Sequence, residues 1–331
     1  MRHLRNPVVI LFAVGLAYIA ALIAVDARRH VFDALPMLAM ALPYVVVFSL
    51  VAYVLRYLRW HYFLNQQGFQ VPFAGGAVAY IAGFAFTASP GKAGELLRVR
   101  YYAAWGVPAP TVIACFVLER FLDLLVLLAI SVPAFAEASG FAVAVGFVGA
   151  VGAAVASAIR WRRSGRNIVA VMRRLGLRRA SQLVRIVLLG VEQISAFANI
   201  RNLSVGLMLG AAAWLAQCYG FSLALGKLGI DVGAVLLVSI PAAAMLLGAA
   251  SMIPGGVGTT EAATVVLLTG YGAETANSVL GSIALRLGSI WFGVGIGFAA
   301  VAYLESRRRA RNVAPPCKEA ALPRQINSGA I

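Results

Sequence analysis

Long apolar segments follow one another along most of the chain, separated by short polar stretches. They fall near residues 7–25, 35–55, 71–89, 111–135, 140–159, 203–227, 232–252 and 277–303, and shorter apolar pieces follow near 95–105 and 261–271. A helix of about 20 apolar residues reaches across the hydrocarbon core of a bilayer. The pattern therefore predicts an all-α polytopic membrane protein.

The composition supports this prediction, because 61% of the residues are hydrophobic and only 12% are charged. A soluble domain cannot bury so much apolar surface. Strands of a membrane barrel alternate polar and apolar residues over about 10 positions, whereas these runs are continuous. Residues 7–25 are long enough to span the membrane, so we interpret them as a first transmembrane helix and not as a cleaved signal peptide.

One long polar stretch divides the apolar segments into two groups. Nine arginines lie between residues 160 and 185, which indicates a cytoplasmic linker, and residues 183–199 are typical of an interfacial amphipathic helix. The basic, Pro-containing tail predicts disorder. The predicted regions are a first membrane repeat at 1–159, the linker at 160–202, a second membrane repeat at 203–304 and the tail at 305–331.

The positions of the basic residues predict the topology, since cytoplasmic loops are enriched in Lys and Arg. Basic clusters near the N-terminus, at Arg56 and Arg59, in the linker and in the tail are placed inside. Segment 71–110 must then start and end inside, and segment 232–273 must start and end outside. We therefore expect an inverted repeat with about six full spans, two re-entrant hairpins and both termini in the cytoplasm.

A motif of Pro, Gly and Glu occurs twice, about half a chain apart, at residues 90–95 and 254–261. An Arg follows the Glu of each copy by 25 positions, as Arg120 and Arg286. Pro lacks an amide donor and Gly accepts unusual backbone angles, so each copy should interrupt a helix. Interrupted helices at matching places in two halves are typical of a transporter binding site.

Charged side chains within the apolar segments define the candidate site. A charge near the bilayer centre costs at least ~2.5–3.5 kcal/mol, so it must be paired or face a cavity. Four acids and four bases are present in the motif regions. The predicted substrate-binding and translocation residues are Pro90, Gly91, Lys92, Gly94, Glu95, Arg98, Glu119, Arg120, Asp123, Pro254, Gly255, Gly256, Gly258, Glu261 and Arg286.

Two interpretations of these charges stay open: a closed network of ion pairs, and a polar cavity for a charged lipid headgroup. Glu95 and Glu261 fall in the first turn of the restarting helices, where a carboxylate also caps free amides. Arg120 and Arg286 are expected to approach each other near the axis of the repeat. The aromatic and basic stretch at residues 56–62 is typical of a membrane interface.

These motifs resemble those of a known family. The run S-P-G-K-A-G-E-L-L-R at 89–98 is similar to the first signature of the lysyl-phosphatidylglycerol synthase transmembrane (flippase-like) family. The run L-E-R-F-L-D at 118–123 resembles its E-R-x-x-D signature, and I-P-G-G-V-G-T-T-E at 253–261 resembles its P-G-G-x-G-x-x-E signature. Arg59 and Trp60 also fit. The resemblance extends over roughly residues 7–304.

The resemblance implies a bacterial inner-membrane protein that moves a charged-headgroup lipid between leaflets. Its best-known members flip aminoacylated phosphatidylglycerol and carry a cytoplasmic aminoacyl-transferase domain, which we do not expect in this chain. We expect a lipid with an anionic or zwitterionic headgroup as partner, a homo-oligomer or a lipid-biosynthesis protein as a further partner, and no nucleic acid. Three scattered cysteines indicate no metal site, and no cofactor is expected.

Two other functions remain open. The first is a membrane enzyme acting on a lipid-linked substrate of the polyprenyl-phosphate type, since such enzymes also use re-entrant repeats. The hydroxyls near the two motifs are those of Thr87, Ser89, Thr259 and Thr260. No histidine lies inside an apolar segment, which argues against this class. The second is a partner without transport activity in lipid or hopanoid biosynthesis.

Overall fold

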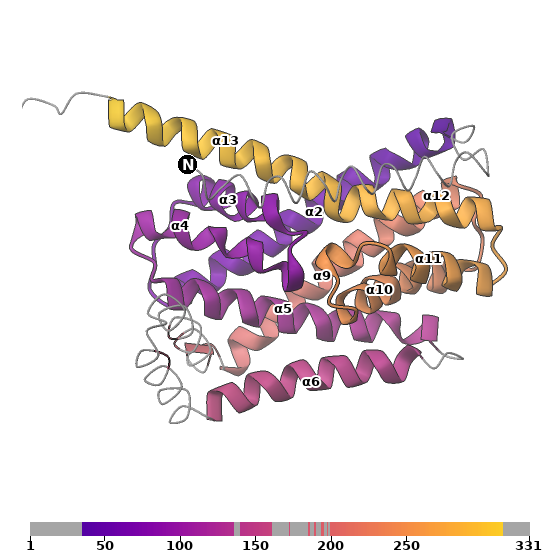
Figure 1. Cartoon of the computed structure of the whole chain (residues 1–331), viewed down its shortest axis with the longest axis horizontal. Coiled ribbons are helices and arrows are strands. Elements are labelled where there is room, and N and C mark those ends of the chain that lie inside the picture. The colour runs from indigo at the N-terminus through magenta and orange to yellow at the C-terminus, as the bar shows by residue number, and fades with distance from the viewer. Residues whose placement is uncertain are drawn as a thin grey trace, which may run out of the picture.

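The structure is a computed structural model that describes residues 35–135, 140–160 and 199–313, with positions 172, 185, 189, 193, 194 and 197. All regular secondary structure in these ranges is helical (Figure 1). The segments are α2 (Leu35–Gln66), α3 (Phe73–Ala82), η3 (Gly83–Phe86), η4 (Pro90–Leu97), α4 (Arg98–Tyr102), η5 (Ala103–Trp105), α5 (Ala109–Ser131), η6 (Val132–Phe135), α6 (Gly140–Arg160), α9 (Ile200–Lys227), α10 (Ala234–Ala250), η7 (Pro254–Gly256), α11 (Thr259–Gly270), α12 (Thr275–Arg286), η8 (Leu287–Trp291) and α13 (Phe292–Val313).

Three helical stretches in the described ranges are long and apolar enough to cross a membrane: Pro36–Gln66, Ile200–Lys227 and Thr275–Arg308. Helices α5 and α6 have 23 and 21 residues, which is also close to spanning length. The prediction of an all-α membrane protein is thus confirmed. The predicted helix at 7–25, nearly all of the predicted interfacial helix and the tail beyond Val313 lie outside the described residues.

Helices α2 and α9 lie side by side in opposite directions through the middle of the molecule. At one end of the helix pair, the Tyr62 hydroxyl donates to Asn202 Oδ1 at 2.9 Å. Toward the other end, Lys227 Nζ lies 5.9 Å from the ring centroid of Tyr44. Gly206 permits this close packing, since a Cβ there would meet Phe63 at 2.6 Å. The helix pair connects the two ends of the molecule.

The structure corrects the prediction for the end of the second apolar segment. We expected a helix at 35–55 followed by a basic loop, but α2 continues without interruption to Gln66. Arg56 and Arg59 therefore lie inside the helix, with 7% and 0% of their surface exposed, and Trp60 is equally buried. These two arginines therefore do not form a loop. They enter the interior because other helices supply partners for their charges.

The first motif interrupts a helix at the expected place. The chain runs through α3 and η3, reverses near Ser89, and returns through η4 and α4, so that α3 contacts α4 and η3 contacts η4. Lys92 adopts a left-handed backbone with φ of 56°, which is rare for a residue with a side chain. Gly94 is required by packing, because a Cβ there would clash with Phe86.

The second motif interrupts the chain in the same way. Helices α10 and α11 contact each other on either side of η7. Gly255 and Gly256 both have left-handed φ angles, 64° and 62°, which a glycine adopts at little cost. The two interruptions also meet, because η4 contacts η7. In Figure 1, α3 and α4 lie at the left, whereas α10 and α11 lie toward the right.

The last apolar segment is longer and less regular than predicted. Instead of one helix at 277–303, α12, a π-helical turn at η8 and α13 follow one another from Thr275 to Val313. The predicted boundary at residue 304 therefore falls inside α13. A Cβ at Gly297 of this helix would clash with the backbone at Ala85. This contact holds α13 directly against the first interruption.

Candidate functional site

Helix α5 carries the acidic half of the site in its middle. Glu119 and Asp123 are spaced one helical turn apart and therefore share a face, and both are almost fully buried. Arg59 of α2 lies between them, with Nη2 at 3.0 Å from Glu119 Oε1 and at 2.8 Å from Asp123 Oδ1. One buried guanidinium thus joins two buried carboxylates, and this arrangement anchors α2 to α5.

The first interruption supplies a second ion pair. Arg98 Nη2 lies 3.0 Å from Glu95 Oε2, and Arg98 Nη1 lies 3.4 Å from Glu119 Oε2. Tyr80 stacks under this guanidinium at 3.8 Å and donates its hydroxyl to Glu119 at 2.6 Å. Thr87 donates to Glu95 Oε1 at 2.8 Å. The carboxylate of Glu95 is therefore held on both oxygens, and the returning arm of the interruption is joined to α5.

Arg120 completes this first cluster and is the most exposed of its charged groups. Its Nη2 lies 3.1 Å from Asp123 Oδ2 and 3.4 Å from Glu119 Oε1, and 19% of its side chain is exposed. Its Nε is buried and makes no hydrogen bond to any described residue. Arg120 thus combines a paired end with a free donor at the edge of the cluster.

The second interruption is held by a separate cluster. Arg286 Nη1 and Nη2 donate to the backbone oxygens of Gly255 and Gly256, at 2.8 and 2.5 Å. Its Nε lies 2.7 Å from Glu261 Oε1, and Glu261 Oε2 accepts from the Gly258 amide at 2.9 Å. Glu261 therefore caps α11, as expected for a carboxylate in the first turn of a restarting helix. Glu95 was expected in the same position, but it lies beyond the first turn of η4. Arg286 clamps the turn of its own half.

The structure distributes the predicted residues over these two clusters. The first brings together Glu95, Arg98, Glu119, Arg120 and Asp123, and the second brings together Gly255, Gly256, Gly258, Glu261 and Arg286. Pro90 and Gly91 begin η4, and Pro254 begins η7, so the prolines start the short helices after each reversal. Among the described residues, no ion pair joins the first cluster to the second.

Several residues of the site escaped the sequence analysis. Arg59 lies in the stretch 56–62 that is typical of a membrane interface, but it pairs with two buried carboxylates. Arg56 is also buried, donates to Gln217 Oε1 at 2.7 Å and lies 4.3 Å from the ring centroid of Trp214. No motif or pattern in the sequence marks Tyr80 or Ser289 as part of the site. One signal was available for the two arginines: they lie three positions apart directly after the apolar segment 35–55, so they would share a face if the helix continued.

A small polar cavity lies where the first interruption faces α2, α5 and the helix after Arg286. Its volume is about 20 Å³, close to the space that one water molecule needs. The lining side chains come from both halves of the sequence. They include Tyr53, Arg56, Thr87, Lys92, Glu95, Arg120 and Ser289.

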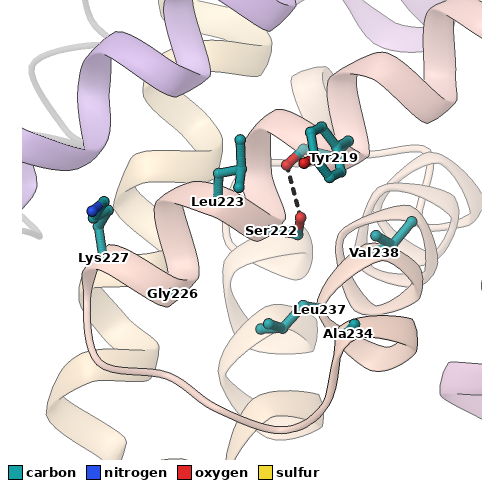
Figure 2. Close-up of a pocket in the computed structure, with 8 residues that line it drawn as sticks. All are labelled: Tyr219, Ser222, Leu223, Gly226, Lys227, Ala234, Leu237 and Val238. Atoms are coloured by element: carbon teal, nitrogen blue, oxygen red, sulfur yellow. Dashed lines mark hydrogen bonds between the residues drawn. The ribbon is translucent and has the colours of Figure 1, made fainter.

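A second, larger cavity of about 430 Å³ lies between α9 and α10 (Figure 2). Its walls are mainly apolar, and Lys227 is the one charged residue among those that line it. Ser222 is satisfied within its own helix, because it donates to the Tyr219 carbonyl oxygen at 2.8 Å. None of the predicted site residues lines this groove.

These observations define a helical membrane protein with two interrupted helices and buried clusters of charge. The chain belongs to the lysylphosphatidylglycerol synthase TM region family, whose model matches residues 8–297. The family suggested by the sequence motifs is thus confirmed over most of the chain. A comparison with curated proteins finds no match. Family membership points to a role connected with membrane lipids.

Proposed function

We propose that this protein moves a lipid with a charged headgroup between the two leaflets of a bacterial inner membrane. The observation that carries the proposal is the small cavity lined by Arg56, Lys92, Glu95 and Arg120. Charged groups inside a membrane protein are costly and mark substrate pathways. A charged lipid headgroup that crosses the hydrocarbon region also needs groups that compensate its charge, and these side chains could supply them.

The pathway we propose passes the first interruption. The headgroup would move along the polar side chains while its acyl chains stay in the surrounding lipid. The fixed charges offset the loss of its hydration. The cavity has only about 20 Å³, so a headgroup enters only after it widens. Rocking of one half against the other, with the contact between η4 and η7 as the fulcrum, would supply this widening.

We further propose that segments 71–110 and 232–273 are re-entrant hairpins of an inverted repeat, entering from opposite faces. The contacts between α3 and α4, between α10 and α11, and between η4 and η7 support this arrangement. In each hairpin, the chain would enter the membrane from one face and leave it by the same face without crossing the bilayer. Both termini would then lie in the cytoplasm.

Cysteine labelling tests this topology. Single cysteines at positions 70 and 110 should react with a membrane-impermeant maleimide only from the cytoplasmic side, and cysteines at 231 and 274 only from the outside. The native thiols Cys115 and Cys218 are buried, and replacing all three native cysteines with Ser removes the background. Labelling of positions 70 and 110 from opposite faces would contradict the hairpin.

Transport in proteoliposomes tests the proposed function. Arg120→Ala should slow the transbilayer movement of a fluorescent anionic phospholipid by about 10-fold to 100-fold, because a charge-assisted hydrogen bond is worth about 1.5–3 kcal/mol. A dithionite-quenching assay measures the rate. Arg100→Ala is the matched control, since Arg100 pairs with Glu305 at an exposed position. Equal rates in the wild type and the Arg120 variant, at equal stability, would reject the proposal.

One observation favours the alternative of a membrane enzyme. The Thr87 hydroxyl donates to the buried Glu95 carboxylate at 2.8 Å, which is the arrangement of a nucleophile and its base. Both oxygens of Glu95 are already engaged, however, by Thr87 and Arg98. In the same assay, Thr87→Val removes the hydroxyl and no charge. If the protein moves lipid, transport should persist in this variant. If Thr87 is instead the nucleophile of an enzyme acting on a lipid-linked substrate, the variant would lose that enzymatic activity.

A further inference from the structure

The buried charges around the first interruption do not balance. The motif regions hold four acids and four bases, but the structure brings Arg56 and Arg59 into the same interior. Arg59 is neutralised by Glu119 and Asp123. Arg56 makes no ion pair with a carboxylate of the described residues, and its partners are an amide and an aromatic ring. The cavity therefore carries an excess of positive charge.

The donors that line this cavity are also incompletely used. Among the residues that line it, three buried donor atoms have no hydrogen-bond partner among the described residues: Arg56 Nε, Arg120 Nε and Ser289 Oγ. All three residues line the cavity together with Lys92. The Lys92 side chain forms no hydrogen bond or ion pair with the described residues, and the left-handed φ of 56° at this position is an unusual conformation for Lys. Such strain is often found where a side chain is held for a ligand.

We infer that Arg56, Lys92, Arg120 and Ser289 form a subsite for a phosphate group, with Arg56 as a ligand that the sequence motifs do not contain. Guanidinium groups suit phosphate oxygens because they offer several donors in one plane. Glu95 is the one carboxylate among the residues that line the cavity, so an anion faces three cationic side chains and one acid. Thr87 lies on the same wall but is engaged with Glu95.

This inference rests on the proposed function, because it assigns the part of the headgroup that the cavity would hold. The same chemistry fits the phosphodiester of a lipid and free inorganic phosphate. A lipid phosphodiester would bring its acyl chains along the outside of the cavity. Free phosphate would bind without them.

Binding to the purified full-length protein in detergent tests the subsite without any transport step. The probes are dioctanoyl phosphatidylglycerol, dioctanoylglycerol, which lacks the phosphate, and inorganic phosphate, with affinity measured by microscale thermophoresis. The phosphatidylglycerol should bind at least about tenfold more tightly than dioctanoylglycerol. Tighter binding of the lipid than of inorganic phosphate identifies a lipid phosphodiester as the ligand, and the reverse identifies free phosphate.

Substitutions locate the binding site. Arg56→Gln and Lys92→Gln should each weaken binding of the phosphate-containing probe roughly tenfold, and Ser289→Ala should weaken it less. Lys227→Gln, in the groove of Figure 2, is the control that leaves binding unchanged. If Arg56→Gln does not fold, binding to Lys92→Gln tests the subsite. The Lys92 side chain makes no hydrogen bond or ion pair with the described residues, so its replacement removes no such interaction from the folded protein.

The outcomes separate this inference from the proposed function. Equal affinity for phosphatidylglycerol and dioctanoylglycerol, or binding that neither Arg56→Gln nor Lys92→Gln weakens, overturns the phosphate subsite even if the protein transports lipid. Binding that depends on these residues, in a protein that moves no lipid in proteoliposomes, supports the subsite and rejects the transport function.

Discussion

Replacement of Arg59 by Met is expected to lower the free energy of unfolding by about 3–5 kcal/mol. Arg59 has no exposed surface and holds the carboxylates of Glu119 and Asp123 at 3.0 and 2.8 Å. Without it, two buried negative charges face each other with fewer partners. Met fills a similar volume, so the loss measures the missing charge more than a missing side chain.

Thermal or denaturant unfolding of the purified protein in detergent measures this effect. Arg100→Met is the control, because its ion pair with Glu305 is 44% and 32% exposed and should contribute less than about 1 kcal/mol. Adding Glu119→Gln to the Arg59 variant removes one of the two buried negative charges that Arg59 contacts and should restore part of the stability. Equal stability of the Arg59 and Arg100 variants would mean that the buried pairs do not hold α2 against α5.

The interruptions were predictable because their cause is local. Pro90 and Pro254 cannot continue a hydrogen-bonded helix from the preceding turn, and Gly255 and Gly256 after the second proline accept left-handed backbone angles. The spacing of 25 positions has a direct structural meaning in the second half, where Glu261 and Arg286 form an ion pair. In the first half, Glu95 pairs with Arg98 instead of Arg120. Local chemistry was enough to find the two interruptions.

The role of Arg59 was not predictable in the same way. Its neighbours in sequence are Tyr57, Leu58, Trp60 and His61, a mixture that also occurs where helices leave the membrane. What places Arg59 in the interior is Glu119 of α5, which lies 60 positions away. A single sequence contains no information on that pairing. The position of Ser289 at the cavity depends in the same way on distant helices.

The two halves use the same residue types differently. Arg120 keeps a free Nε beside the cavity, whereas Arg286 is engaged by two carbonyl oxygens and by Glu261. The first interruption therefore retains donors for a ligand, and the second is closed upon itself. The two interruptions meet through the contact between η4 and η7.

Arg286→Gln is therefore expected to loosen the second turn. Gln cannot reach both Gly255 and Gly256 carbonyl oxygens and also neutralise Glu261. Breaking this largely buried cluster should cost about 3 kcal/mol locally, the lower end of the range for a buried pair, because Glu261 is 16% exposed. Amide hydrogens in residues 251–262 should then exchange roughly 100-fold faster, provided that they exchange through local opening.

Hydrogen–deuterium exchange measured by mass spectrometry shows whether Arg286 holds the second turn in place or binds a lipid headgroup. Glu261→Gln is the matched variant: it keeps both bonds from Arg286 to the glycine carbonyl oxygens and should accelerate exchange less. Residues 87–98 should keep their protection in both variants, since their ion pairs lie in the other cluster. Unchanged exchange at residues 251–262 in Arg286→Gln, together with lost lipid transport, would instead make Arg286 a headgroup ligand, as the sequence motif predicts.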